Sequence, residues 1–221
     1  MQTSERELQQ EYQLRFSQIA NYRRKVWRIL VKNYFQDLVG DNRDILDLGC
    51  GWGEFVNQVR AKTKYAMDLN PDAPDYLESN VRFIHQDCSK TWPLEENSLD
   101  VVFTSNFLEH LLSKESLSQT LAEAYRCLKP GGKMICLGPN LKYTGGAYWD
   151  FFDHHLPLTD ASISEVLQLQ GFRVETCLPK FLPYTMANGK QPPLWTVSVY
   201  ISLPLAWKFL GKQFLVVARK P

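Results

Sequence analysis

The spacing of apolar residues divides the chain into alternating helices and strands. From about residue 4 to 38 apolar positions recur every three or four residues, which predicts an amphipathic helix with a break near Asn21. Helical patterns return at 54–60, 116–128 and 162–171, the last opened by a capping box from Ser162 to Glu165. Short apolar runs predict seven strands, at 45–48, 65–68, 81–85, 99–104, 133–137, 172–177 and 213–218.

This alternation predicts an α/β fold with a doubly wound sheet and helices on both faces. The strand pattern and the switch after Ser105 predict the strand order 3-2-1-4-5-7-6, with the last strand antiparallel. At 221 residues the chain is long enough for one substantial core. We therefore expect a single domain over 1–221, with an N-terminal helical cap at 1–40.

A glycine-rich turn follows the first strand. Its sequence is Asp47-Leu48-Gly49-Cys50-Gly51-Trp52-Gly53. Glycine adopts positive φ easily and has no Cβ, so this spacing predicts a sharp turn that a ligand can approach closely. The helix predicted at 54–60 would point free backbone N–H groups at the turn, where an anionic group would be stabilised. A tight turn without a ligand is the alternative, although three glycines make such a turn costly in entropy.

Net charge and cysteine content indicate which class of partner and which cellular compartment to expect. A formal charge of +1 gives no general attraction for nucleic acid, so we expect no nucleic-acid partner, although local basic patches remain open. The N-terminal helix carries many cations, which form either a solvated face or a site for an anionic substrate. Five cysteines without a Cys-x-x-Cys pair and a polar N-terminus predict a reduced, cytoplasmic location. Nothing in the sequence predicts an oligomeric state.

The glycine turn resembles the first motif of the class I S-adenosylmethionine (SAM) methyltransferases, which have a Rossmann-like fold. Asp68 lies 19 residues after Gly49, at the end of the second strand, where an acid can accept both ribose hydroxyls. Asp87 and Cys88 correspond to the adenine site, although Asp87 could instead cap a turn at Ser89. The resemblance implies that SAM is the cofactor and that it contacts Asp47, Gly49, Cys50, Gly51, Gly53, Asp68, Leu69, Asp87, Cys88 and Asn106.

The segment from Ser105 to Leu111 resembles the Glu-His-Leu motif of the quinone-type and sugar-type methyltransferases. Some relatives bind a metal through a glutamate three positions before the Glu-His pair. Asn106 occupies that position here, so we predict no metal. His110 is one candidate for a catalytic base, and His154 and His155 are the others, because imidazole titrates near neutrality. Each of the three could instead be a structural hydrogen-bonding group.

Two segments, 141–158 and 179–211, are predicted to lie over the substrate. The first has no clear period and is dense in aromatic, acidic and histidine residues, as functional segments often are. Its predicted substrate contacts, together with the residue that ends strand five, are Asn140, Tyr148, Trp149, Asp150, Phe152 and Asp153. The second contains an apolar stretch from Leu194 to Leu210 that is broken by Pro204. That stretch predicts a broken core or lid helix, a peripheral contact with the inner membrane face, or a transmembrane helix.

The regions Arg15 to Trp27 and Tyr148 to Thr159 look like a bacterial subgroup of methyltransferases associated with polysaccharide or glycolipid assembly. This resemblance implies O-methylation of a sugar, nucleotide-sugar or glycolipid hydroxyl. Methylation of another small metabolite, phenolic or amine, is the main alternative, and a SAM-binding protein without catalysis is a third. Protein or RNA methylation is a weaker alternative.

Overall fold

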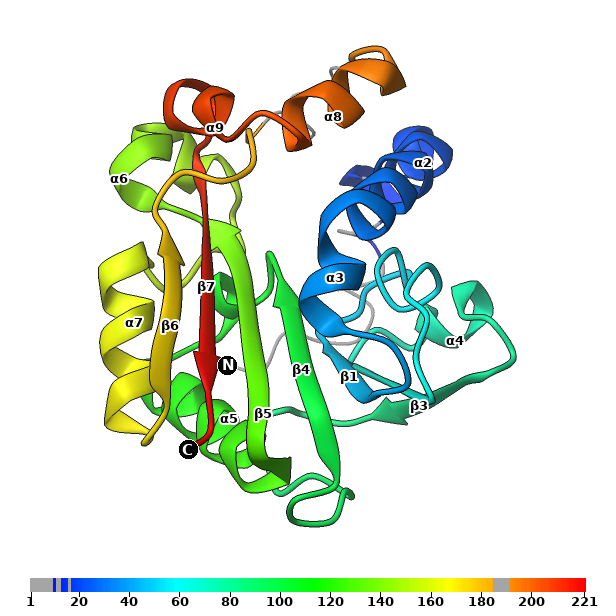
Figure 1. Cartoon of the computed structure of the whole chain (residues 1–221), viewed down its shortest axis with the longest axis vertical. Helices are drawn as coiled ribbons and strands as arrows, with labels where there is room; N and C mark the ends of the chain where they lie inside the picture. The colour runs from blue at the N-terminus through cyan, green and yellow to red at the C-terminus, as the bar shows by residue number, and fades with distance from the viewer. Residues whose placement is uncertain (1–9, 11–12, 16, 185–190) are drawn as a thin grey trace.

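The computed structural model describes residues 10, 13–15, 17–184 and 191–221, and these form a seven-stranded mixed sheet with helices on both faces (Figure 1). The strand order is β3-β2-β1-β4-β5-β7-β6. The strands are β1 (Asp44–Leu48), β2 (Thr63–Asp68), β3 (Val81–His85), β4 (Leu99–Ser105), β5 (Leu128–Pro139), β6 (Arg173–Leu178) and β7 (Gln213–Arg219). β7 runs antiparallel to β5 and β6, and the other pairs are parallel. The predicted order and the antiparallel last strand are confirmed.

The helical segments vary in length and type. They are η1 (Ser17–Ile19), α2 (Ala20–Leu30), the π-helical η2 (Val31–Phe35), α3 (Gln36–Val39), α4 (Ala73–Tyr76), η3 (Leu108–His110), α5 (Lys114–Cys127), α6 (Leu141–Thr144), η4 (Gly145–Asp150), α7 (Asp160–Leu169), α8 (Leu194–Ile201) and α9 (Pro204–Leu210). The change from 3-10 to α geometry at Ala20 lies next to the break predicted at Asn21. The predicted N-terminal helix before Ser17 falls largely outside the described residues.

Two apolar layers hold the helices to the sheet. Side chains alternate between the faces along each strand, so Leu46 and Leu48 point one way and Ile45 the other. The first layer packs against α5 and α7, and the second packs against α2 and η2. In the second layer the ring of Trp27 lies 6.0 Å from that of Phe103. The N-terminal helix is therefore part of the core.

The helix predicted at 54–60 is wrong, because this stretch forms only hydrogen-bonded turns. The backbone N–H of Val56 donates to the Asp47 side chain at 3.2 Å. Two i to i+4 bonds remain, from Asn57 to Gly53 and from Val59 to Phe55, but they are not consecutive. The sequence therefore overstated the role of a helix N-terminus at the glycine turn.

Two other local predictions need correction. Helix α7 is capped by Thr159, which forms a capping box with Ser162, whereas the sequence suggested Ser162 with Glu165. The predicted break in the apolar stretch is present, since α8 and α9 meet just before Pro204. No helix among the described residues, α8 and α9 included, is long and apolar enough to cross a membrane.

Candidate active site

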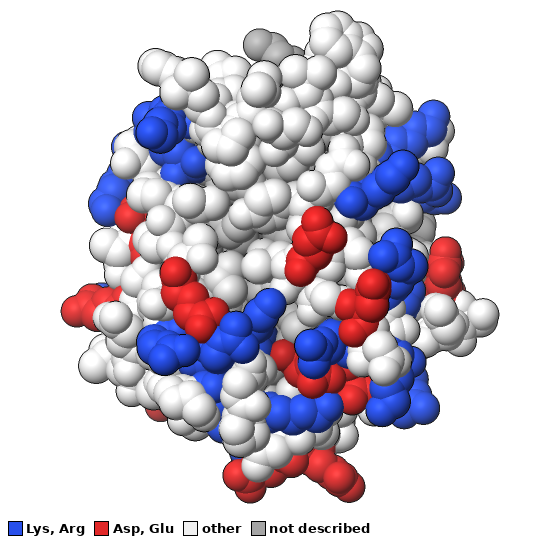
Figure 2. Space-filling model, viewed as in Figure 1, with Lys and Arg blue, Asp and Glu red and all other residues white. Residues whose placement is uncertain are grey.

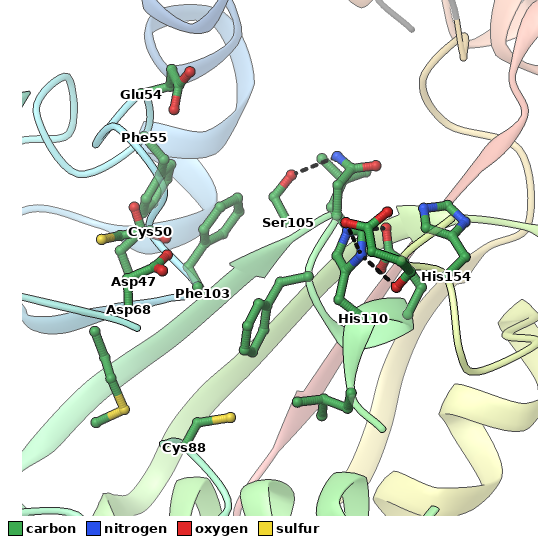
Figure 3. A pocket seen from close by; sticks show the side chains of 18 of the residues that line it. Asp47, Cys50, Glu54, Phe55, Asp68, Cys88, Phe103, Ser105, His110 and His154 are labelled. Atoms are coloured by element: carbon green, nitrogen blue, oxygen red, sulfur yellow. Dashed lines mark hydrogen bonds and ion pairs between the residues drawn. The ribbon is translucent and has the colours of Figure 1, made fainter. Parts of the chain in front are cut away.

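A cavity of about 300 Å³ lies at the carboxyl ends of β1, β2 and β4, where the strand order switches direction (Figure 3). Open α/β sheets place ligands at this point, and the volume is in the usual range for small-molecule sites. Three acids from the ends of successive strands line it, namely Asp47, Asp68 and Asp87. His110 lies toward the other end, and its neighbour Glu109 also lines the cavity. The cavity therefore joins an acidic end to an end that contains histidine.

Gly49, Gly51 and Gly53 all have positive φ, as the turn requires. A Cβ on Gly49 would lie 2.1 Å from the Phe107 ring, and one on Gly53 would lie 2.6 Å from Leu77. Close packing of the protein itself therefore demands glycine at these two positions. Of the residues predicted to bind the cofactor, Gly51 and Gly53 do not line the cavity. The other eight do line it, namely Asp47, Gly49, Cys50, Asp68, Leu69, Asp87, Cys88 and Asn106.

Asp68 is held by the backbone and still has capacity to accept hydrogen bonds. One carboxylate oxygen accepts the N–H of Gly51 and the other accepts the N–H of Asn70, both at 2.8 Å. Burial raises the pKa of Asp68, while these bonds to Asn70 and Gly51 lower it. A carboxylate oxygen can accept more than one hydrogen bond, so both oxygens can still accept from a ligand. This arrangement suits a pair of neighbouring hydroxyls.

Asp87 caps the turn at Ser89 and also faces the cavity. Its Oδ1 accepts both the backbone N–H of Ser89 at 2.9 Å and the Ser89 hydroxyl at 2.8 Å, so it caps the turn. It also lines the cavity next to Cys88 and Leu111. The Cys88 carbonyl accepts the indole N–H of Trp92 at 2.8 Å, which fixes this part of the wall.

His110 sits in a network of charges at the other end. Its Nδ1 lies 3.0 Å from an Asp153 carboxylate oxygen, and that carboxylate binds the Arg15 guanidinium with both oxygens, at 2.8 and 2.6 Å. Burial opposes a charged imidazole, but the hydrogen bond to Asp153 and the charges of Glu109 and Asp153 outweigh it. Together they raise the pKa of His110 to about 9. Burial also raises the pKa of Glu109, to about 7.

His154 has the opposite character. Its ring lies 4.9 Å from that of His110 and 5.1 Å from that of Phe151, and the side chain is buried (Figure 3). Its Nδ1 has no hydrogen-bond partner among the residues that the structure describes. Burial and then the positive charge of His110 lower the pKa of His154 to about 4. At neutral pH, His154 is therefore a neutral imidazole, whereas His110 carries a proton on each ring nitrogen.

The predicted substrate contacts are only partly at the cavity. Asp153 lines it, and so does the exposed His155, whose backbone N–H donates to the Glu109 carbonyl at 2.9 Å. Tyr148, a predicted substrate contact, does not line the cavity, since it is fully buried and its hydroxyl bonds to the backbone of Leu156 and Leu158.

The remaining predicted contacts lie elsewhere. Trp149 is 52% exposed and Phe152 93% exposed, on the outer surface. Asn140 is buried and binds Asp160 and Pro179. None of these three lines the cavity, and neither does Asp150. The two predicted lid segments nevertheless contribute other residues to its wall, namely Phe151, Asp153, His154 and His155 from the first and Leu182, Pro183 and Tyr184 from the second.

Four charged residues of the cavity wall were not among the predicted site residues, namely Arg15, Arg23, Glu54 and Glu109. Arg23 pairs with Glu54 at 3.0 Å. Glu109 could have been found, because it precedes His110 in the Glu-His motif. The two arginines stood in the sequence only as members of a basic helix, without a signal that separated them from their exposed neighbours.

Glu109, His110 and His154 are also the residues to consider for a metal. Their ligand atoms lie within 4.8 Å of one another, the one such group found among the described residues. A histidine must lose its proton to bind a metal. The ion pair with Asp153 keeps His110 protonated. We therefore interpret the cluster as a site of proton transfer and not as a metal site. The absence of a metal stays a prediction.

Comparison with known proteins agrees with this geometry. A family model described as a methyltransferase domain matches residues 46–136, which include β1, β2, β3 and β4 and the glycine turn. A crystal structure of a SAM-dependent methyltransferase from Archaeoglobus fulgidus superposes with a TM-score of 0.69, at 20% identity, over 93% of this chain and 99% of that one. Residues 46–136 thus match a methyltransferase domain, and the chain has the fold of a SAM-dependent methyltransferase.

Two relatives show the range of proteins that share this domain. A probable SAM-dependent methyltransferase of Mycolicibacterium smegmatis is 28% identical over 63% of this chain and 55% of its own length. A tRNA N(3)-methylcytidine methyltransferase of Schizosaccharomyces pombe is 29% identical over 42% of this chain and 35% of its own. The chain thus spans about half or less of these relatives.

The cavity of the methyltransferase domain fits SAM, the cofactor of the family. SAM carries a sulfonium, an ammonium and two ribose hydroxyls, all of which are favoured by acidic acceptors. Asp47, Asp68 and Asp87 supply three such acceptors in one cavity. Apolar side chains of Phe107, Leu111 and Leu112 complete the wall for the flat base. Asp68 would hold the ribose and Asp87 the adenine, and Asp47 lies at the turn that faces the methionine end.

Proposed function

We propose that this protein transfers the methyl group of SAM to a hydroxyl of a sugar, nucleotide sugar or glycolipid, and that His154 accepts the proton of that hydroxyl. The observation that carries this proposal is the pairing, in one cavity, of an acid-lined cofactor end with a buried neutral imidazole. His110 serves as a fixed positive charge, because Asp153 holds its proton in place.

The reaction divides the work between cofactor and protein. SAM, when bound, supplies a methyl group on a positive sulfonium, so that a carbon–oxygen bond forms as the carbon–sulfur bond breaks. The chain holds the acceptor in line, which can contribute about 7 to 11 kcal/mol to lowering the barrier. His154 takes the hydroxyl proton as the new bond forms, and general-base catalysis of this kind contributes a factor of about 10² to 10⁴.

A polar acceptor suits this end of the cavity better than a phenol. Glu109, His110 and Asp153 present carboxylate and imidazolium groups there, with Arg23 and Glu54 on another part of the wall. Buried polar groups need partners, and an acceptor with several hydroxyls provides them. Three aromatic residues predicted to contact the substrate, Tyr148, Trp149 and Phe152, do not line the cavity.

The relatives do not support the exclusion of nucleic acid, since one is named a tRNA methyltransferase. That exclusion rests on the net charge of +1 alone. The deciding experiment is a methyl-transfer screen with labelled SAM against nucleotide sugars, lipid-linked glycans, phenols, amines and tRNA. We expect label on a sugar hydroxyl. Label only on a phenol, an amine or tRNA would refute the acceptor class and leave SAM binding intact.

A further inference from the structure

Helices α8 and α9 form one edge of the molecule, beyond the carboxyl ends of the parallel strands (Figure 1). They are firmly attached to the core. Ile201 and Trp207 are buried, and the Trp207 ring packs 5.0 Å from that of Phe181. The Trp207 indole N–H donates to the Tyr200 carbonyl at 2.9 Å, and the Tyr200 hydroxyl donates to the Phe181 carbonyl at 2.6 Å. These contacts fix the orientation of both helices. The side of the helices that faces away from the core is therefore also fixed.

That opposite side is apolar and exposed. We call it the α8–α9 patch, and it consists of Trp195, Val199, Leu203, Leu205, Phe209 and Leu210, which are between 48% and 77% exposed. A single exposed leucine is ordinary in a soluble protein, but six large apolar side chains on two adjoining helices are not. The sequence from Leu194 to Trp207 contains no charged residue. A partner that covers this patch must itself be apolar across the whole of the patch.

The charges around the patch indicate which partner fits. Figure 2 shows the region of α8 and α9 free of charged side chains, with Lys and Arg on both sides and acidic residues only farther down this face. On one side, α2 packs against α8, and exposed cations lie along α2 and the following η2, namely Arg24, Lys25, Arg28 and Lys32. On the other side, Lys208 and Lys212 are exposed at and after α9. Positive charge therefore flanks an apolar centre.

We propose that the α8–α9 patch docks on the surface of a lipid bilayer that contains anionic lipids. Helices with exposed Trp, Phe and Leu and flanking cations lie in the plane of the interface, with the apolar side chains among the upper acyl chains and the cations at the head groups. Neither helix needs to change its contacts with the core to do so.

Docking also orients the cavity. Some residues belong both to the cavity wall and to the apolar layer under α8. Leu182 lines the cavity and packs in the same layer as Ile201. Trp27 and Leu30 of α2 likewise belong to both. A docked protein would thus hold its cavity near the lipid head groups, which selects an amphiphilic acceptor such as a glycolipid over a free nucleotide sugar. Only this last step rests on the proposed function.

The test is sedimentation of the full chain with phosphatidylcholine vesicles, with and without phosphatidylglycerol. The patch variant is the triple substitution Trp195→Ser, Leu205→Ser and Phe209→Ser. Its control is Leu169→Ser on α7, because Leu169 is 77% exposed, the same as Phe209. A charge variant, Lys25→Glu with Lys32→Glu, tests the basic flank. Circular dichroism and melting temperature show that each variant is folded, and no step requires methyl transfer.

We expect the wild type and Leu169→Ser to sediment with anionic vesicles, and the patch variant to bind about tenfold or more weakly. The charge variant should lose its preference for phosphatidylglycerol, and added salt should weaken the wild type. Wild type that stays in the supernatant with both vesicles overturns the proposal. So does a lipid-free dimer, detected by sedimentation velocity, that the patch variant dissociates, since a second copy would then cover the patch.

Discussion

Asp68 is a residue whose two carboxylate oxygens each accept one backbone N–H bond and can accept another from a ligand. Asp68→Asn keeps the shape but replaces one acceptor by a donor. We expect SAM affinity to fall about tenfold or more, because hydrogen bonds to charged groups are worth about 1.5 to 3 kcal/mol. Calorimetric titration measures the effect. Asp75→Asn, on the exposed surface of α4, is the matched control. Equal affinity in all three proteins would mean that Asp68 does not hold the ribose.

His154 and its neighbour provide a test of the base. His154 is buried and its Nδ1 has no partner among the described residues, whereas His155 is exposed at the cavity wall. We expect His154→Gln to lower turnover by about 10² or more and to leave SAM affinity and melting temperature nearly unchanged. His155→Gln should lower turnover far less. If His155→Gln has the larger effect, the roles are reversed, and if neither slows turnover, positioning alone carries the reaction.

At the scale of elements, substitutions in glycine-rich turns can separate the cost of a positive φ from the cost of a steric clash. Alanine at Gly49 meets both a positive φ and the Phe107 ring, alanine at Gly145 meets only a positive φ, and alanine at Gly146 meets neither. A left-handed residue costs about 1 to 2 kcal/mol. Urea denaturation should therefore show a loss of about that size for Gly145→Ala, a larger loss for Gly49→Ala and almost none for Gly146→Ala.

The double variant Gly49→Ala with Phe107→Ala completes the series. Removal of the ring should make Gly49→Ala cost no more than Gly145→Ala does, when each is measured against its own parent. A Gly49→Ala cost that is unchanged in the Phe107→Ala background would show that the ring is not what requires glycine there.

The elements themselves could largely be predicted from the sequence. Each predicted strand is present, because alternate residues such as Ile45 and Leu46 face two different apolar layers. The sequence could not show that 54–60 does not form a helix, since the bond from Val56 to Asp47 depends on how the turn folds back on β1. The role of Tyr148 was equally hidden. A dense aromatic segment suits a cavity wall or a core, and its bonds to Leu156 and Leu158 decide for the core.

Over the whole molecule, the least predictable contact is the ion pair of Arg15 with Asp153 at the histidine end of the cavity. Arg15 and Asp153 are 138 residues apart, so no local pattern connects them. The Arg15 guanidinium also lies over the Phe151 ring, 5.0 Å from its centre. Through this contact, the segment before α2 holds the loop that carries Asp153 and His154. The proton on His110 therefore depends on parts of the chain that only the complete fold brings together.

Asp153→Asn tests this dependence. Removal of the carboxylate should lower the pKa of His110 clearly from about 9, because burial is then opposed only by the charge of Glu109 and the backbone carbonyl of residue 153. NMR titration of the histidine ring protons measures the shift, with His110→Gln to assign the resonance. Asp150→Asn, exposed in the same loop, should leave the pKa near 9. An unchanged pKa in Asp153→Asn would contradict the ion-pair model.

The same pair sets how stability depends on pH. The pKa of His110 is raised in the folded state, so its stabilisation is complete below pH 6.5 and is lost as pH rises through about 9. The pKa of Asp153 is lowered from 3.8 by His110 and Arg15 against the opposing effect of burial, so its stabilisation is lost as pH falls below that value. Asp153→Asn should therefore cost most between pH 4 and 6.5, by about 3 kcal/mol, and less at pH 9. Urea denaturation across this range measures the difference, and a cost that does not fall toward pH 9 would show that Asp153 does not hold a proton on His110 in the folded protein.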